Sequence, residues 1–390
     1  MRLGADIVIL SAARSPFGKF GGALKDLTAT DMGVHAARAA IQRAGIAADK
    51  IDHVVFGNAL QTSLGSPYLA RHIGLTVGIP ISVPALVVNR LCGSGFQSII
   101  SGAELLMLDE ANFVVAGGVE SMSQAPHVIR GARWGMALGA GKLEDFLSSS
   151  LTDGYCDLSM AMTAEKVAER YGISRAQADQ FAYLSQQRTH LARQCGYFND
   201  EIAPITRLLE QDEHPRPDTS IEALATLKPV FKRDGVVTAG NASGICDGAS
   251  AVILTTAENA RMHDLKPLAK IVSWGIVGCD PAMMGLGPVW AIRKALERGD
   301  LTLDQMGLIE VNEAFAAQYL AVEKELGLDR DKVNVNGGAI AIGHPLGATG
   351  SRIVTTMVYE LKRRGARYGI GSACIGGGQG IALVVENLAG

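Results

Sequence analysis

Short apolar runs alternate along the chain with stretches that have helical apolar spacing. Residues 7–10 form a continuous apolar run just after Asp6, and because a secretory signal core would not contain that acid, the segment is predicted to be the first strand. Residues 96–107 show the spacing of an amphipathic helix, and the apolar segment 113–118 that follows ends in two glycines. This alternation of strands and helices predicts an α/β fold whose mostly parallel sheets are covered by helices.

The same pattern returns 255 residues further along the chain. The helical run 351–361 and the apolar segment 368–374 repeat the run 96–107 and the segment after it. Matching residues at this separation are Arg43 and Arg298, Asp49 and Asp304, Ile51 and Met306, and Gly95 and Gly350. Chance is the alternative, because any two strand–helix–strand units share an apolar rhythm, but one unchanged offset over two stretches more than fifty residues apart favours a duplication.

The stretch between the two repeats differs in character and is predicted to be an insertion carried by the first half. It contains the glycine-rich segment 134–141, a polar helix predicted over residues 163–195, and the proline-broken segment 212–218. The predicted organisation is an N-terminal half of residues 1–120 plus 243–266, a loop domain of residues 121–242, and a C-terminal half of residues 267–390.

Composition and charge exclude several classes of partner. The chain has 36 basic and 39 acidic residues without long runs of either sign, for a net charge of −3, so nucleic acid is not an expected partner. No apolar run approaches the ~20 residues of a membrane helix, so no membrane partner is expected either. The six cysteines form no C-x-x-C pair and have no histidine at ligand spacing, which predicts reduced thiols, no metal site and a cytoplasmic location.

Cys92 is the first candidate for chemistry. It stands just ahead of the helical run 96–107, where the positive end of the helix dipole would favour the thiolate, the nucleophilic form of the side chain. Gly93 and Gly95 leave the approach to its sulfur open. The alternative is a small buried core cysteine, which is the usual fate of a free thiol.

His344 lies in the glycine-rich segment 334–350, and the residue 255 positions before it is Asn89, three residues ahead of Cys92. If the two halves pack about a pseudo-twofold axis, these two turns face each other and bring an imidazole near the thiol. The alternative is a histidine in a surface turn without a task. The arrangement predicts a base for the candidate nucleophile.

Cys374 is a second cysteine ahead of a glycine run, residues 376–378, whose consecutive N–H groups can form a concavity for an oxyanion. A dinucleotide-binding fingerprint is excluded because Ile381 stands where its last glycine would be required. With two thiols, one can hold an acyl group as a thioester while the other moves a proton beside a second thioester carbonyl. A hydroxyl has too high a pKa for either task, whereas a thiol with a pKa of about 8.5 can be tuned into range.

Five segments, in order, resemble the motifs of the thiolase family. They are NRLCGSG (89–95), NASG (241–244), NEAF (312–315), GGAIAIGHPLG (337–347) and CIGGGQG (374–380). The resemblance covers essentially the whole chain. It implies the five-layered αβαβα thiolase fold, with duplicated halves and an inserted loop domain that binds coenzyme A.

The resemblance also implies roles for individual residues. Cys92 would be the acylated nucleophile, His344 the base that activates it, and Cys374 the acid and base at the substrate α-carbon. Asn312 would hold a water that forms one oxyanion hole with His344, and the N–H groups of Cys92 and Gly376 would form the other. Residues implied along the pantetheine arm of coenzyme A are Met160, Ser243, Ala314 and Phe315, with Arg216 near the phosphates and adenine. For Arg216 the alternative is a solvated loop arginine.

Within the family the sequence is most similar to 3-ketoacyl-CoA thiolases of the mitochondrial type. Ser159 stands where acetoacetyl-CoA thiolases usually carry a histidine, which argues against strict short-chain specificity. The implied activity is CoA-dependent cleavage of 3-ketoacyl-CoA, with coenzyme A and acyl-CoA thioesters as substrates and no tightly bound cofactor. The alternatives are an acetoacetyl-CoA thiolase working in the biosynthetic direction, a ketoacyl synthase, against which Cys374 speaks, and a non-catalytic acyl-CoA-binding protein. The family forms homodimers and homotetramers, in which the segment 125–140 can join dimers.

Overall fold

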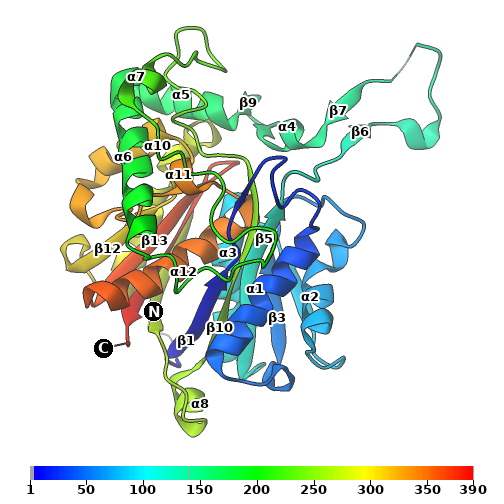
Figure 1. Cartoon of the computed structure of the whole chain (residues 1–390), viewed down its shortest axis with the longest axis vertical. Coiled ribbons are helices and arrows are strands. Elements are labelled where there is room, and N and C mark those ends of the chain that lie inside the picture. Colours follow the sequence, from blue (N-terminus) through cyan, green and yellow to red (C-terminus); the bar gives the residue numbers. More distant parts are fainter. Residues whose placement is uncertain (1–3, 140, 390) are drawn as a thin grey trace.

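The framework of the protein is a sheet of ten strands, seen in a computed structural model that describes residues 4–139 and 141–389 (Figure 1). In spatial order the strands are β12 (Met306–Val311), β13 (Tyr368–Ile375), β14 (Gln379–Asn387), β11 (Ala269–Gly278), β1 (Ile7–Arg14), β10 (Cys246–Thr256), β5 (Phe113–Ser121), β3 (His53–Gly57) and β4 (Ala85–Val88), with β2 (Gly18–Lys19) paired to β10. Strands β1 and β11 pair only at Val8 with Lys270 and Ile9 with Ala269. This short ladder joins two similar sets of strands, one from each half of the chain.

The two sets follow the repeat found in the sequence. Phe113 begins β5 and Tyr368 begins β13, 255 residues later. Strand β3 pairs parallel with both β4 and β5, and in the second half β12 pairs parallel with β13 and forms an isolated parallel bridge to Val333 on its other side. The duplication predicted from the offset is therefore confirmed.

The sheet is mixed, so the prediction of mostly parallel sheets is wrong. Strands β10 and β14 run antiparallel to both of their main neighbours. Strand β13 turns into β14 through residues 376–378, where Gly377 and Gly378 have φ of 79° and 76°. A connection this short can join only antiparallel neighbours, whereas a parallel pair needs a crossover of a dozen or more residues.

Helices lie on both faces of each set of strands. They are α1 (Ala29–Ala44), α2 (Leu69–Val77), α3 (Ser94–Met107), α9 (Gly287–Gly299), α10 (Ala316–Leu326) and α12 (Leu346–Arg364). The short helix α8 (Ala257–Met262) lies beyond the end of β10 (Figure 1), and the short helix α11 (Ala339–Ile342) comes just before α12. In β1 the side chains of Ile7 and Ile9 join the core around α3 and α12, while Val8 and Leu10 pack against α1. This alternation buries both faces of the strand.

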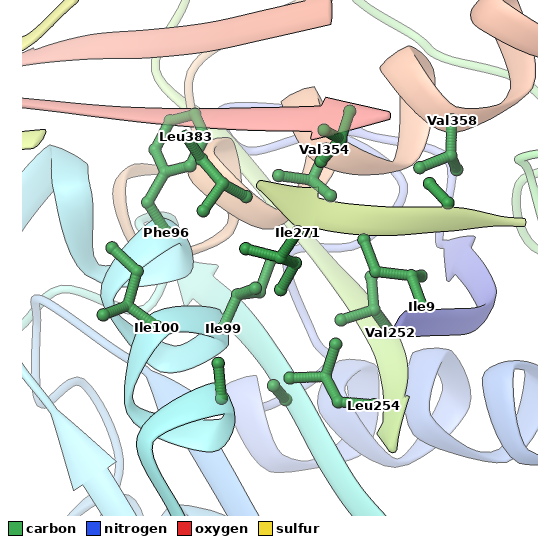
Figure 2. Packing of buried hydrophobic residues seen from close by; sticks show 14 of the residues in the cluster. Ile9, Phe96, Ile99, Ile100, Val252, Leu254, Ile271, Val354, Val358 and Leu383 are labelled. Atoms are coloured by element: carbon green, nitrogen blue, oxygen red, sulfur yellow. The ribbon is translucent and has the colours of Figure 1, made fainter. Parts of the chain in front are cut away.

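Helices α3 and α12 form the middle layer, between the two sets of strands (Figure 2). Ile99 of α3 and Val354 of α12 lie in one core with Val252 and Leu383, which come from strands of different halves. Burying one such side chain completely stabilises the fold by about 1.5–3 kcal/mol. The order of layers is helix, sheet, helix, sheet, helix, which confirms the predicted fold class.

Two glycines at equivalent positions let the middle helices approach each other. A Cβ added to Gly95 would lie 2.5 Å from the backbone nitrogen of Ser351, and one added to Gly350 would lie 2.2 Å from that of Phe96. Both distances are below any real Cβ contact, so only glycine fits at either place. Each repeat therefore packs the start of its helix against the equivalent start in the other, which brings the segments before these helices together.

The inserted segment contains the outlying elements of the molecule. They are β6 (His127–Ile129), β7 (Leu143–Asp145), α4 (Phe146–Ser150), β8 (Thr152–Asp153), β9 (Leu158–Ser159), α5 (Met160–Tyr171), α6 (Arg175–Gln194) and α7 (Ile221–Ala225). The hairpin of β6 and β7 reaches away from the body as an arm (Figure 1). The single helix predicted over 163–195 is wrong, because Gly172 ends α5 with a φ of 63° and Ser174 caps the start of α6.

A buried arginine anchors the insertion to the sheet. Arg14 of β1 is fully buried and bonds Glu201 through Nε at 2.7 Å and both carboxylate oxygens of Asp212 at 2.7 and 2.8 Å. These charge-assisted bonds satisfy the guanidinium away from water. Within the described parts of the chain, no helix is both long and apolar enough to cross a bilayer.

Candidate active site

The two halves and the insertion together line one hollow of about 350 Å³. Its wall includes seven of the ten site residues predicted from the sequence, namely Cys92, Met160, Ser243, Ala314, Phe315, His344 and Cys374. Asn312 and Gly376 contact members of this group directly, whereas Arg216 lies in a second hollow. The structure therefore gathers nine of the ten candidates around one space.

Cys92 lies in a tight turn between β4 and α3. The turn is held by Asn89, whose Oδ1 accepts from the Leu91 N–H at 2.9 Å, and by Ser94, whose hydroxyl donates to the Leu91 carbonyl at 2.7 Å. Leu91 has a φ of 46°, which a leucine rarely adopts, and the turn is therefore strained. Side-chain bonds at both ends keep it in this shape.

The thiol of Cys92 is the resting form, contrary to the prediction of a stabilised thiolate. Burial raises the pKa of the Cys92 thiol to about 11, and the N–H groups of Gly376 and of Cys92 itself lower it by less. Desolvation disfavours the charged form and outweighs the two N–H groups here. The nucleophile therefore needs a base at the moment of attack.

His344 is such a base, held between α11 and α12. Its Nδ1 lies 2.6 Å from the hydroxyl of Thr349, which in turn donates to the Pro345 carbonyl at 3.0 Å. Because the single O–H of Thr349 is used in the bond to the Pro345 carbonyl, its oxygen must accept from Nδ1–H of His344, which leaves the lone pair on Nε2. Burial, aided by the charge of Arg352, lowers the pKa of His344 to about 3, so the imidazole is neutral.

A glycine also allows Cys246 to pack closely against the turn that carries His344. Gly343 has a φ of 109°, and a Cβ on it would lie 2.2 Å from the sulfur of Cys246. The following N–H, that of His344, donates to the Gly244 carbonyl at 3.0 Å, which ties the turn to the segment just after the insertion. Asn312 follows β12 and brings its Nδ2 to 3.3 Å from Nε2 of His344.

Cys374 brings the second thiol to the same hollow from β13. It is almost fully buried, and burial, followed by the neighbouring Cys92, raises the pKa of the Cys374 thiol well above its ordinary value. Both sulfurs are therefore protonated at rest, and the neutral imidazole of His344 is the acceptor for a proton. This combination can form a thioester at one sulfur and exchange a proton at the other.

The remaining candidates line the way into the hollow. Ser243 donates its N–H to the Ala314 carbonyl at 3.0 Å, and Ala242 bridges to Phe315, so the end of the insertion pairs with the C-terminal half. Arg216 is exposed beside a second hollow of about 120 Å³. Residues 239–240 line this second hollow and residues 242–245 line the first, so the two lie along one segment.

Sequence reasoning missed the groups that support these residues. Glu120 is fully buried beside the hollow, and burial raises the pKa of its carboxyl group to about 7. Thr349, which fixes the tautomer of His344, and Asn89, which holds the Cys92 turn, were also missed as functional residues. The signal for Glu120 was available, since it is a single acid in an otherwise apolar and small-residue strand.

Comparison with known proteins gives the family. A profile described as "Thiolase, N-terminal domain" matches residues 7–258, and one described as "Thiolase, C-terminal domain" matches residues 265–387. The chain belongs to the thiolase family. The human protein named "3-ketoacyl-CoA thiolase, mitochondrial" is 53% identical to this thiolase, with 100% of each chain covered.

Two crystal structures resemble this thiolase over its length. That of human mitochondrial 3-ketoacyl-CoA thiolase in complex with CoA superimposes with a TM-score of 0.98 at 54% identity, covering 99% of each chain. That of the Bacillus anthracis acetyl-CoA acetyltransferase gives a TM-score of 0.97 at 44% identity, covering 100% of each chain.

These findings decide several of the expectations. The predicted family, fold and thiolase function are confirmed, and the protein is an acyltransferase. The predicted cytoplasmic location is contradicted by the human relative, which is named as mitochondrial. The prediction rested on Asp6 and on reduced thiols, and neither feature distinguishes the cytoplasm from an organelle. The exact division into two halves and a loop domain stays a prediction.

Proposed function

We propose that this thiolase cleaves 3-ketoacyl-CoA with CoA, through an acyl group held on Cys92. The observation that carries the proposal is the meeting of two protonated thiols and one neutral imidazole on the wall of a single hollow. Each of the three groups is in the protonation state that the first step requires. The same set of groups serves the reverse reaction, the condensation of two thioesters.

In the first half-reaction the sulfur of Cys92 attacks the 3-keto carbon while its proton passes to Nε2 of His344. The bond between the α- and β-carbons of the substrate then breaks, and the leaving enolate takes the proton of Cys374 to become acetyl-CoA. In the second half-reaction the Cys374 thiolate takes the proton of incoming CoA, whose sulfur attacks the acyl group. Cys92 leaves as a thiolate and recovers its proton from His344.

Two groups of donors stabilise the oxyanions of these steps in this proposal. The N–H groups of Cys92 and Gly376 both lower the pKa of the Cys92 thiol, which supports a role for them as donors to the oxygen of an acyl group on that sulfur. The second site is formed by His344 and a water held by Asn312, whose Oδ1 accepts no hydrogen bond from the described residues. Loss of one such donor raises the barrier by about 3–4 kcal/mol.

Coenzyme A is proposed to lie along both hollows. Its pantetheine arm would follow Met160, Ser243, Ala314 and Phe315 into the first hollow, and its adenine and phosphates would lie near Arg216 at the second. The shared segment 239–245 supports this path, because it connects the two spaces. The Arg216→Ala variant should raise KM for CoA and leave kcat unchanged, and an unchanged KM would favour a solvated loop arginine.

The apolar part of the lining of the first hollow bears on the length of acyl chain that the hollow accepts. Met122, Leu151 and Leu346 line it with apolar surface, and Ser159 caps α5 through its hydroxyl instead of presenting an imidazole. An apolar wall is suited to acyl groups longer than acetyl, at about 0.8 kcal/mol for each buried methylene. The alternative is an acetyl-CoA acetyltransferase, the name carried by the Bacillus anthracis relative.

Thiolysis rates for acetoacetyl-CoA and a medium-chain 3-ketoacyl-CoA, measured side by side on the purified protein, test this proposal. A preference for the longer chain is expected. A preference for acetoacetyl-CoA would support the acetyltransferase instead. Activity on neither, with binding retained, would indicate a non-catalytic acyl-CoA-binding protein.

We also propose that the protein is a homodimer or a homotetramer. Its arm exposes Trp134 and Leu138 at 87% and 107% of their free area, and β4 lies at an edge of the sheet. Large apolar side chains in such positions are typical of contacts between subunits. Light scattering on the purified protein should give a mass of two or four chains, and a single-chain mass would refute this.

A further inference from the structure

Glu120 is a buried carboxylate beside the hollow to which the proposed mechanism gives no task. Its Oε1 accepts from the side-chain amide of Asn58 at 2.8 Å and from the N–H of Leu60 at 2.9 Å. Its Oε2 accepts from the N–H of Ala59 at 3.1 Å and from that of Gly347 at 2.8 Å. The four donors come from two segments that are far apart in the sequence.

The segment 58–60 supports the turn of the nucleophile. The side-chain amide of Asn89 donates to the Ala59 carbonyl at 3.1 Å, and its Oδ1 accepts from the Leu91 N–H at 2.9 Å. Glu120 therefore holds segment 58–60, which holds Asn89, which fixes the strained residue just before Cys92. A displacement of segment 58–60 would be passed on to the sulfur.

Gly347 supports the turn of the base. It lies three residues after His344, in the first turn of α12, and it is pressed against the strands of the other half. A Cβ on Gly347 would lie 2.5 Å from the Val119 carbonyl oxygen, and one on Gly118 would lie 1.9 Å from the Gly347 carbonyl oxygen. These close approaches bring the Gly347 N–H within reach of Glu120.

A carboxylate is the side chain that matches these four donors. Ionised, it accepts through both oxygens and donates nothing, whereas the amide of glutamine would direct N–H bonds at two of the donors. Bonds from N–H groups to an ionised acceptor are also shorter and stronger than neutral ones. All four of these bonds run to protein groups, so Glu120 acts on the geometry of the reacting atoms through the two turns, and its charge adds a smaller upward effect on the pKa of the Cys92 thiol.

We propose that Glu120 is a positioning residue that fixes the Cys92 turn and the His344 turn relative to each other, and so sets the rate at which Cys92 becomes acylated. The inference rests on the proposed roles of Cys92 and His344. Asn89 and His344 occupy equivalent places in the two repeats, and Glu120 bonds to the segments that support both. Glu120 therefore links the two equivalent turns across the contact between the halves.

The test compares Glu120→Gln with Glu201→Gln, a matched change at a carboxylate that is equally buried but bonds Arg14 away from the hollow. Single-turnover acylation by a 3-ketoacyl-CoA should fall by about 100-fold in E120Q, the loss expected for a misplacement of ~1 Å, with KM kept within about twofold. The E201Q variant should acylate within about twofold of the unmodified protein. Thermal unfolding of both variants controls for a general loss of structure.

The proposal is overturned if E120Q acylates within about twofold of the unmodified protein, or if E201Q loses the same rate as E120Q. Should E120Q fail to fold, Asn89→Ala decides the matter, because this exposed residue links segment 58–60 to the Cys92 turn and its truncation leaves the core intact. It should slow acylation by about tenfold at an unchanged KM, and an unchanged rate would refute the proposal. Failure of the proposed function would be visible separately, as acylation that persists in Cys92→Ala.

Discussion

Replacing Gly118 by alanine should disable the enzyme without touching any group in the hollow. The added Cβ would lie 1.9 Å from the carbonyl oxygen of Gly347, whereas an ordinary contact begins at 3.4 Å. The first turn of α12 must therefore retreat from β5 by about 1.5 Å, which is the difference between these two distances. Because His344 is three residues before Gly347, the base moves relative to Cys92.

The expected losses of rate and of stability follow from this movement. A misplacement of about 1 Å at a catalytic group lowers the rate by about 10²-fold, and the overpacked contact should lower the free energy of unfolding by about 1–3 kcal/mol. The rate is measured as kcat for thiolysis of a 3-ketoacyl-CoA, and the stability by urea unfolding. Gly154→Ala is the matched control, because a Cβ at Gly154 meets nothing within 4 Å and should leave both quantities unchanged.

If Gly118→Ala kept kcat within about twofold and the free energy of unfolding unchanged, the close packing of the two repeats would not determine the geometry of the site. A loss of stability at full kcat would show that the helix retreats without moving His344. Either result would refute the reasoning from the Gly118 and Gly347 contact.

Three further predictions follow from the protonation states and the buried charges. Cys374→Ser should still form the acyl-enzyme but exchange α-protons about 10²-fold to 10⁴-fold more slowly, and normal exchange would exclude Cys374 as the acid and base. Alkylation of Cys92 by iodoacetamide should accelerate about tenfold for each pH unit between pH 7 and 10, because burial raises the pKa of its thiol to about 11 and the thiolate forms only as pH rises; a rate already at its plateau at pH 7 would contradict this. Arg14→Leu should lower the free energy of unfolding by about 3–5 kcal/mol in urea, since it leaves Glu201 and Asp212 buried without their partner; a loss below about 1 kcal/mol would contradict that account.

The repeat was the part of the fold that the sequence predicted best. Gly95 and Gly350 match at the offset of 255 because each must be glycine for the other helix to approach. The same packing constraint therefore leaves a glycine at the equivalent position of each repeat. The strand directions were not predictable in the same way. An antiparallel neighbour such as β14 has the same apolar pattern as a parallel one, and only the length of the turn at 376–378 distinguishes them.

Local signals were available where the helix prediction failed. The boundary between α5 and α6 contains Gly172 and Ser174, a common C-terminal signal followed by an N-cap, and the apolar spacing on both sides hid it. Cys92, His344 and Cys374 were found because glycine-rich segments mark them, whereas Asn312, Arg216 and the residues along the pantetheine arm were implied only by the resemblance to the family. The position of Glu120 as the single acid of an apolar strand was visible in the sequence, but its task was not, because its partners are three N–H groups and one side-chain amide that only the fold brings together.

The protonation state of Cys92 could not be predicted from its place before a helix. The N–H groups of Gly376 and Cys92 do favour the thiolate, but desolvation of the thiol in the folded protein is the larger effect. The extent of burial at one atom depends on the packing of both halves and the insertion. It is therefore a property of the folded chain that no short motif contains.

Mass spectrometry of the intact protein after brief mixing with a 3-ketoacyl-CoA, without free CoA, tests the central claim most directly. The account predicts one added acyl group per chain, located on the peptide that carries Cys92, absent in Cys92→Ala and discharged when CoA is added. An acyl group on any other residue, or none at all in a protein that still performs thiolysis, would contradict it.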